Sequence, residues 1–287
     1  MIKLLYNVDM SQYCTMRVGG KAASACFAKS KSELAEAIDH CLANGMEYTV
    51  IGNCSNVIFA DGVYNGCVIF TSKMSSFEFD GDTLTAYAGA SLTAMASEAM
   101  QRGLSGLEFA YGIPGTLGGA VYMNAGAYGG EISDVFVSCD CFDKDGIYRQ
   151  FDKNCMQFLY RHSALQNNGC VMISAKLRLT QGDKDIIKQK TEANMAARKA
   201  KQPLDMPSCG SAFKRPGGHY AGALIEQAGL KGGKVGGAQV STKHAGFIVN
   251  AGGATAEDVI LLSELIKDHV FLNSGVALES EIRFIGR

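Results

Sequence analysis

The sequence predicts a two-domain protein that mixes helices with short strands. Its 287 residues exceed the commonest domain size, which favours two domains over one. Short apolar segments bounded by turn residues alternate with stretches that carry helix-capping signals. The chain changes character near Gln181, where a polar, lysine-rich stretch typical of a helix begins and runs to Lys201. We therefore predict domains at residues 1–182 and 183–287.

The first helix is predicted over residues 30–45. Ser30 and Glu33 form a capping box at its start, and Gly45 provides the stop. One face carries Leu34, Ile38 and Leu42.

Two short strands follow, with a small-residue loop between them. The strands are predicted at residues 48–51 and 57–60, and the loop is G-N-C-S-N, Gly52 to Asn56. A Rossmann unit has instead a strand, a glycine loop and a helix, and its G-x-G-x-x-G signature is absent. The sequence therefore argues against a Rossmann domain.

The later elements follow the same alternation. Short strands with a turn at Asp80-Gly81-Asp82 precede a helix from about Ser91 to Gln101, which Gly103 ends. Thr255 and Asp258 mark the start of the last helix. The other predicted segments are strands near 135–142, 171–179 and 276–285, and helices at 181–201, 221–228 and 255–270.

The most informative segment is Gly112 to Tyr128, G-I-P-G-T-L-G-G-A-V-Y-M-N-A-G-A-Y. It contains five glycines and no charged residue. Glycines gathered in this way indicate positive φ angles or a ligand that lies against the main chain. Unpaired backbone N–H groups in such a segment suit an oxygen-rich anion such as a diphosphate. The run predicts an anion site, and leaves open a mononucleotide, a dinucleotide or a sugar phosphate.

The composition argues against several classes of protein. Charged residues make up 19% and the net charge is -1, so no general basic surface is available to hold nucleic acid. No apolar run approaches the roughly 18 residues of a membrane span. Residues 1–11 lack the basic start and apolar stretch of a signal peptide. We expect a cytoplasmic protein that binds neither nucleic acid nor membrane.

The cysteines and histidines do not indicate a metal site. Ten cysteines are scattered without a C-x-x-C pair, which predicts reduced and mostly buried thiols. Cys139 and Cys141 would share one face of a strand, and we favour buried thiols there over a metal or redox role. The five histidines are dispersed, without H-E-x-x-H spacing, so we expect no metal.

Two charged segments have more than one interpretation. Gly229 to Val235, G-L-K-G-G-K-V, is one residue short of a P-loop and lacks its Ser or Thr, so we predict a turn. In the last predicted strand, alternation places Glu279, Glu281 and Arg283 on one face. That face fits either a solvated edge strand or a ligand site.

Two single residues are ambiguous by themselves. Ser211 lies in C-G-S-A-F-K-R-P, where glycine and proline frame a turn, and no G-x-S-x-G elbow surrounds it. Arg161 lies in Y-R-H-S and is, without other information, a surface arginine.

Taken together, these segments resemble the UDP-N-acetylenolpyruvoylglucosamine reductases, also called UDP-N-acetylmuramate dehydrogenases. The resemblance covers nearly the whole chain. It rests on seven motifs in the family's order: R-V-G-G-K-A (17–22), G-N-C-S-N (52–56), G-I-P-G-T-L-G-G (112–119), Y-R-H-S (160–163), C-G-S-A-F-K-R-P (209–216), S-T-K-H-A-G-F (241–247) and E-I-R-F-I-G (281–286).

The resemblance implies an α+β fold with non-covalently bound FAD. It implies a two-lobed FAD-binding module of the vanillyl-alcohol-oxidase type, with lobes at about 1–72 and 73–182, and a smaller α+β substrate-binding domain. The last strand, about 276–287, would pack back toward the FAD module. Cys54 replaces the glycine common at the centre of the first flavin loop, which requires its side chain to point away from the cofactor. The implied cofactor-binding residues are Gly52, Asn53, Cys54, Ser55, Asn56, Gly89, Ala90, Gly112, Ile113, Pro114, Gly115, Thr116, Gly118, Gly119, Ala120, Asn124 and Arg283.

The resemblance also implies a reaction in the synthesis of peptidoglycan precursors. NADPH reduces the flavin, and hydride then passes from flavin N5 to the enolpyruvyl ether of UDP-N-acetylglucosamine, giving UDP-N-acetylmuramate. Arg161 and Glu281 match the pair that stabilises the enolate-like intermediate, and Ser211 matches the proton donor. Glu281 would have to be protonated or paired, because a bare carboxylate opposes a developing anion. A lone serine hydroxyl is a poor acid, so Lys214, Arg215 or the enolate's own high basicity would have to assist Ser211.

Four residues are candidates for binding the substrate's diphosphate and carboxylate as cations: Lys201, Arg215, Lys243 and His244. Lys201 matches a substrate lysine of the family. Glu279 matches no catalytic position. We expect a monomer that acts on small molecules.

The chain resembles the type II subgroup of the family, because only residues 164–169 separate Y-R-H-S from the next strand and a tyrosine loop cannot fit there. Two alternatives stay open: another FAD-dependent oxidoreductase of the same superfamily, acting on a different sugar or alcohol, and a nucleotide-sugar-binding protein that has lost catalysis. The presence of Arg161, Ser211 and Glu281 disfavours the second.

Overall fold

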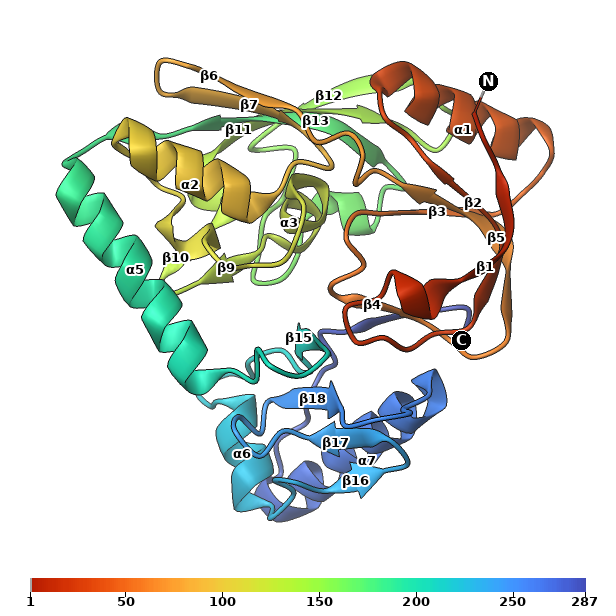
Figure 1. Cartoon of the computed structure of the whole chain (residues 1–287), viewed down its shortest axis with the longest axis vertical. Helices are drawn as coiled ribbons and strands as arrows, with labels where there is room; N and C mark the ends of the chain where they lie inside the picture. Colours follow the sequence, from red (N-terminus) through yellow and green to blue (C-terminus); the bar gives the residue numbers. More distant parts are fainter. Residues whose placement is uncertain (1) are drawn as a thin grey trace. The chain divides into compact units, whose positions relative to one another are not determined.

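The computed structural model describes residues 2–287, which divide into two compact units (Figure 1). The first unit contains the start of the chain as far as Leu5, then Ser24–Asn53 and Gly66–Arg198. The second unit contains Tyr6–Ala23, Cys54–Asn65 and Lys199–Arg287. This division keeps most of helix α5 (Lys184–Lys201) with the first unit. The domain limits at 182 and 183 stay a prediction.

An antiparallel sheet of five strands forms the centre of the first unit. Its order is β12-β11-β13-β7-β6, that is Tyr148–Asp152, Phe136–Phe142, Val171–Arg178, Thr83–Tyr87 and Phe77–Asp80. Ala175 in the middle strand pairs with Cys139 on one side and Ala86 on the other. The predicted turn between β6 and β7 contains Gly81 at φ +58°, a conformation that favours glycine.

Helices α2 (Leu92–Arg102) and α3 (Leu117–Met123) lie on one side of this sheet (Figure 1). Met95 of α2 and Val121 of α3 are fully buried in one core with apolar side chains of the sheet. The ends of α2 are as predicted, with Ser91 as the N-cap and Gly103 left-handed at φ +71°. Short elements complete this part of the chain: β8 (Leu104–Ser105), the 3-10 helix Glu108–Ala110, β9 (Gly126–Ala127), β10 (Gly130–Glu131), α4 (Ile132–Val135), the 3-10 helix Ala164–Gln166 and β14 (Thr180–Gln181).

A second sheet has the strand order β1-β2-β5-β3. The strands are Leu5–Asp9, Lys21–Phe27, Val63–Phe70 and Tyr48–Ile51. β3 and β5 are parallel, with Tyr48 opposite Cys67. Strands β2 and β5 each run from the second unit into the first.

Helix α1 (Lys31–Ala43) differs from its prediction in two details. Ser30 caps the helix by accepting the Glu33 N–H, but the Glu33 carboxylate accepts the Lys29 N–H in place of the Ser30 N–H, so the predicted capping box is wrong. Leu34 and Ile38 are buried, whereas Leu42 is 41% exposed. Cys41 is buried in place of Leu42, because the buried face of the helix includes position 41 and not position 42 in the last turn.

The second unit contains a four-stranded antiparallel sheet and two helices (Figure 1). The strand order is β15-β18-β17-β16, that is Ser208–Ser211, Phe247–Asn250, Ala238–Val240 and Lys234–Val235. The helices are α6 (Ala221–Gln227) and α7 (Ala256–Ser274). Helix α7 begins at the predicted start signal, where Thr255 and Asp258 form a capping box. Elsewhere in this unit, η1 (Met10–Gln12) follows β1, and β4 (Val57–Phe59) pairs in parallel with β19 (Arg283–Ile285).

Two expectations for this unit are settled by the backbone. Residues 229–233 form turns, with Gly229 and Gly232 at positive φ, as predicted, whereas Lys234–Val235 belong to strand β16. The strand expected over 276–285 is wrong in length, since only Arg283–Ile285 is a strand and Ser280 forms an isolated bridge with Phe213. Glu279, Glu281 and Arg283 therefore do not lie along one continuous strand, contrary to what the alternation predicted.

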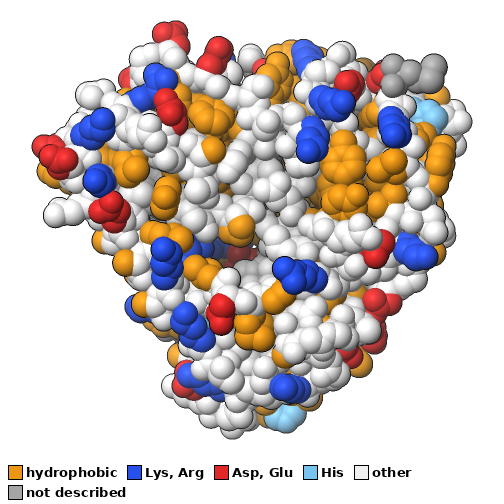
Figure 2. All heavy atoms as spheres, viewed as in Figure 1, with side chains coloured by type: hydrophobic (Ala, Val, Ile, Leu, Met, Phe, Trp, Pro, Cys, Tyr) orange, Lys and Arg blue, Asp and Glu red, His pale blue; other side chains and the backbone are white. Residues whose placement is uncertain are grey.

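The distribution of charged, cysteine and apolar side chains in the described residues agrees with what the composition suggested. On the face shown in Figure 2, basic and acidic side chains are interspersed, as the net charge of -1 suggests. Eight of the ten cysteines are buried and all are free thiols, with Cys170 partly exposed and Cys155 exposed. Within residues 2–287, no helix combines the length and apolar character that a membrane span needs.

Candidate active site

The two predicted anion-binding loops meet in the first unit. A Cβ atom on Gly52 would lie 2.1 Å from Thr116 Oγ1, so only glycine allows this approach. Thr116 is 2% exposed, and its hydroxyl has no hydrogen-bond partner among residues 2–287. A buried hydroxyl without a partner costs roughly 1–3 kcal/mol. The pair Gly52 and Thr116 therefore suits a ligand that supplies an oxygen acceptor.

The glycines of the 112–119 run serve different purposes. Gly112 alone among them has a positive φ, +88°. A Cβ on Gly118 would lie 3.1 Å from the Ala88 Cβ, so this glycine allows close packing. Gly119 is exposed, and a Cβ there would meet only Thr116 Oγ1, at 3.8 Å. Gly119 is thus the open position beside the buried hydroxyl.

Of the two interpretations offered for the glycine run, positive φ applies among its glycines only to Gly112, because the run continues into helix α3 (Leu117–Met123). The Leu117 N–H donates to the Ala90 carbonyl, and the Gly118 N–H donates to the Ala88 carbonyl. These bonds tie the run to the loop between β7 and α2. Gly89 in that loop is required by packing, since a Cβ there would lie 1.9 Å from the Thr71 carbonyl oxygen.

Other predicted cofactor residues surround these loops. Ile113 and Gly115 are held by backbone hydrogen bonds with Ala110 and Leu92. Pro114 and Asn53 are exposed, whereas Ala120 is buried on the inner side of α3. Asn124 is fully buried at the C-cap of α3.

Cys54 adopts the left-handed backbone that a glycine would favour, with φ +50°. Its side chain is buried, and its thiol donates to the Val57 carbonyl at 3.3 Å. Cys14 donates to the same carbonyl at 3.4 Å and lies 3.7 Å from Cys209, sulfur to sulfur. Hydrogen bonding with Cys14, together with burial, raises the pKa of Cys54 and of Cys209. The Cys54 side chain therefore points into the protein as a neutral thiol.

Ser211 and Glu281 lie on neighbouring segments of the second unit. The Glu281 N–H donates to the carbonyl of Ala212, the residue after Ser211. The Asn56 side chain donates to the Glu281 carbonyl at 3.0 Å, and the Arg283 N–H donates to the Asn56 carbonyl at 3.0 Å. Asn56 therefore fixes the backbone on both sides of residue 282.

A bulge in strand β15 precedes Ser211. The register with β18 shifts between Ser208 and Ser211, and Gly210 has φ +76°. Bulges of this kind change the direction of a following side chain. Lys214, a predicted assistant of Ser211, forms an ion pair with Glu279. Its charge is therefore offset by a carboxylate.

Arg161 projects from a tight turn of the first unit. Its φ is +54°, and its Nη2 donates to the Gly126 carbonyl at 3.1 Å. The guanidinium carbon lies 5.0 Å from the centre of the Tyr160 ring.

The predicted substrate residues belong to the second unit. Lys201 is exposed at the end of α5, and the Lys243 ammonium donates to the Lys199 carbonyl at 2.7 Å. The Arg215 guanidinium carbon lies 4.1 Å from the centre of the Tyr220 ring. His244 does not fit the expected cation, because burial lowers its pKa and its Nδ1 accepts the Gly246 N–H. It is a neutral donor through Nε2.

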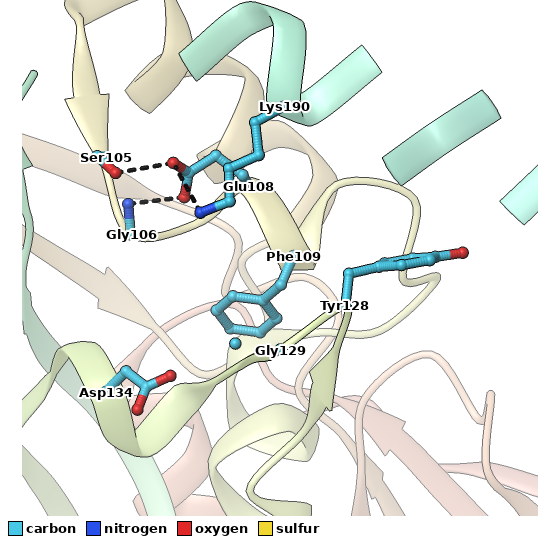
Figure 3. Close-up of a pocket in the computed structure, with 9 residues that line it drawn as sticks. Ser105, Gly106, Glu108, Phe109, Tyr128, Gly129, Asp134 and Lys190 are labelled. Carbon is cyan, nitrogen blue, oxygen red and sulfur yellow. Dashed lines mark hydrogen bonds and ion pairs between the residues drawn. The ribbon is translucent and has the colours of Figure 1, made fainter. Parts of the chain in front are cut away.

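The first unit also has a polar pocket that the sequence did not indicate (Figure 3). Its volume is about 170 Å³, and its walls include Glu108, Phe109, Tyr128 and Lys190. The Glu108 carboxylate accepts hydrogen bonds from Ser105 Oγ at 2.7 Å and from the Gly106 N–H at 2.8 Å, and lies 3.5 Å from the Lys190 ammonium. Burial by itself would raise the pKa of Glu108, but these donors hold it below its ordinary value. The Glu108 carboxylate thus joins residues 105 and 106 to Lys190 of α5, and so holds this helix in place.

Comparison with known proteins decides the family. A family model for the C-terminal domain of UDP-N-acetylenolpyruvoylglucosamine reductase matches residues 202–285, and a model for an FAD-binding domain matches residues 22–152. The UDP-N-acetylenolpyruvoylglucosamine reductase of Lactobacillus johnsonii is 45% identical over 100% of this chain and 96% of its own length. The chain belongs to the UDP-N-acetylenolpyruvoylglucosamine reductase family. The resemblance drawn from the seven motifs is therefore confirmed.

Other members of the reductase family agree in sequence and fold. The protein of Caldicellulosiruptor bescii with this name is 46% identical over 99% of this chain and 91% of its own length. The crystal structure of the enzyme from Thermus caldophilus has a TM-score of 0.85 and 33% identity, covering 99% of this chain and 98% of that one. The predicted α+β fold with an FAD-binding module is confirmed, and the chain is an FAD-dependent oxidoreductase.

Proposed function

We propose that this reductase converts the enolpyruvyl ether of UDP-N-acetylglucosamine to UDP-N-acetylmuramate with NADPH, as a step of peptidoglycan precursor synthesis. FAD, once bound and reduced by NADPH, would supply the hydride to the alkene. The observation that carries the proposal is the placement of Ser211 beside the segment of Glu281, joined through Ala212 and fixed by Asn56. Full-length relatives that carry this name support the substrate. We also propose a cytoplasmic, monomeric enzyme.

The residues present fit the diphosphate of FAD. The unpartnered Thr116 hydroxyl can donate to a phosphate oxygen, and the open side of Gly119 leaves room next to it. Gly52 permits the approach of the first loop. Phosphate oxygens are acceptors that satisfy buried donors of this kind.

The remaining steps are assigned to protein side chains. Addition of hydride to the terminal carbon leaves negative charge on the adjacent carbon and its carboxylate. We assign Arg161 to stabilise that charge, because a guanidinium binds a carboxylate through two parallel hydrogen bonds. Ser211 then gives its proton to the carbon, and Glu281 supports the intermediate in a protonated or paired form. Lys201, Arg215 and Lys243 are proposed to bind the nucleotide diphosphate.

The Ser211→Ala variant tests the reaction by separating its two halves. We expect bound FAD to be reduced by NADPH at nearly the normal rate, and to be reoxidised by the enolpyruvyl ether about 10³-fold more slowly, in the range of lost general-acid catalysis. Stopped-flow absorbance at the flavin bands measures both rates. The Glu281→Gln variant should show the same split, and Ser274→Ala at the end of α7 is the matched control.

Two outcomes would contradict the proposal. If the purified protein lacked flavin absorbance bands and could not take up FAD, the assignment of FAD as cofactor would be refuted. Equal slowing of both half-reactions in Ser211→Ala would show that the serine is not the proton donor.

A further inference from the structure

Arg161 lies at a backbone position that has to be held in place. Leu159 and His162 form two reciprocal backbone hydrogen bonds of 3.1 Å, which close a tight turn around Tyr160 and Arg161. Within this turn Arg161 has φ +54°. A non-glycine residue in this conformation carries strain of about 1–3 kcal/mol, so its surroundings must stabilise it.

The C-terminal end of helix α3 holds the flanks of this turn. Asn124 Nδ2 donates to the Leu159 carbonyl at 3.1 Å, and its Oδ1 accepts the Ser133 N–H at 2.9 Å. Ser163, fully buried, donates to the Tyr122 carbonyl at 2.8 Å. These contacts fix the residues on either side of Tyr160 and Arg161.

Gln166 adds a bond to residue 161 itself. Its Nε2 donates to the Tyr122 carbonyl at 2.8 Å and to the Arg161 carbonyl at 3.0 Å. The two hydrogens of one amide thus join the end of α3 to the peptide group of Arg161. Gln166 ends the 3-10 helix Ala164–Gln166, in the short connection that leads to β13.

We propose that Gln166 is a positioning residue for Arg161. The inference rests on the proposed role of Arg161 in substrate reduction. Holding the Arg161 carbonyl fixes the direction in which the side chain leaves the backbone, and the Gly126 carbonyl fixes part of the guanidinium. Small displacements of a group that binds the reacting part of a substrate reduce rates strongly. A carboxylate at position 166 has the same shape but no N–H to donate.

The Gln166→Glu variant tests this role. We expect FAD reduction by NADPH to stay within about twofold of the wild-type rate, and reoxidation by the enolpyruvyl ether to slow about 10- to 100-fold. Gln166→Met, which has neither donors nor charge, should behave alike and serves if the glutamate variant does not fold. Gln101→Glu, on the exposed side of α2, makes the same change of charge and should leave both rates unchanged.

A double variant distinguishes positioning from general destabilisation. In an Arg161→Ala background, Gln166→Met should cause no further slowing, because it acts through the arginine. The proposal would be overturned if the double variant were slowed by the product of the two single effects. It would also be overturned if the single Gln166 variants slowed both half-reactions equally. Normal reoxidation by Arg161→Ala would instead refute the proposed function of Arg161. If FAD reoxidation were slow in Arg161→Ala but normal in the Gln166 variants, only the role of Gln166 would be refuted.

Discussion

Cys54 shows how a single residue adapts to a loop that favours glycine. Its φ of +50° is unusual for a side chain with a Cβ, yet its thiol is buried near Cys14 and bonded to the Val57 carbonyl. Cysteine has no branch at Cβ, which makes this backbone less costly than it is for valine. The gain from burying the thiol offsets part of the strain.

We therefore expect Cys54→Gly to change the free energy of unfolding by less than about 1 kcal/mol, and Cys54→Val to lower it by about 2 kcal/mol more. Urea unfolding of the two variants measures the difference. Cys155→Val, at the exposed cysteine, is the control and should have little effect. Equal stability of the glycine and valine variants would show that position 54 is not left-handed.

Glu108 shows how one carboxylate holds an element. It binds Ser105, Gly106 and Lys190, and its main-chain carbonyl accepts a hydrogen bond from Asn194 of α5 at 3.3 Å. The polar pocket beside it is therefore part of the attachment of α5 within the first unit (Figure 3).

The lowered pKa of Glu108 predicts how this attachment depends on pH. Its contribution to stability is present above the ordinary carboxyl pKa of about 4.3 and is lost as the pH falls through the lower folded-state value. We expect Glu108→Gln to reduce the free energy of unfolding by about 1–2 kcal/mol at pH 7 and by much less at a pH below the lowered folded-state pKa of Glu108. Urea unfolding at the two pH values is the measurement. Glu98→Gln, in an exposed pair with Arg102, is the control, and an equal deficit for Glu108→Gln at both pH values would contradict the assignment.

The elements differ in how well the sequence predicted them. Caps made the ends of α2 and the start of α7 predictable, since Ser91, Gly103 and Thr255 act locally. Helix α3 was missed, because Gly118 and Gly119 are poor helix formers and tertiary packing against Ala88 determines the helix. The strand over 276–285 was overestimated because alternation continues through residues that have no ladder partner.

The candidate site was predictable only where motifs named it. Ser211 and Glu281 came from the family motifs, and the structure brings their segments together through Ala212. The hydrogen bonds of Gln166 and the attachment by Glu108 depend on residues far apart in the sequence, which no local pattern reveals. The roles of Ser211, Glu281 and Gln166 in turnover stay predictions.

For the whole molecule, thiol accessibility provides a simple test of packing. Eight cysteines are buried, Cys170 is partly exposed and Cys155 is exposed. Native protein should therefore show one rapidly reacting thiol, at Cys155, and denatured protein should show all ten. Hydrogen bonding to Asp152 raises the pKa of Cys155, so its reaction rate should still rise above pH 9. Titration with a chromogenic disulfide measures the number and rate, with Cys155→Ser as control. A fast thiol that persists in that variant would show that the partly exposed Cys170 or a buried cysteine reacts rapidly.

The pairing of β4 with β19 has a consequence for protein synthesis. Val57 lies opposite Arg283, which is 226 residues further along the chain (283 minus 57). At ribosomal rates of about 5–20 residues per second, β4 leaves the ribosome roughly 10–45 s before its partner exists. During that interval its strand edge can pair with other nascent chains, and a chaperone that binds extended apolar segments would protect it. Val57–Phe59 is consequently the segment that we expect such a chaperone to hold until translation has passed residue 285.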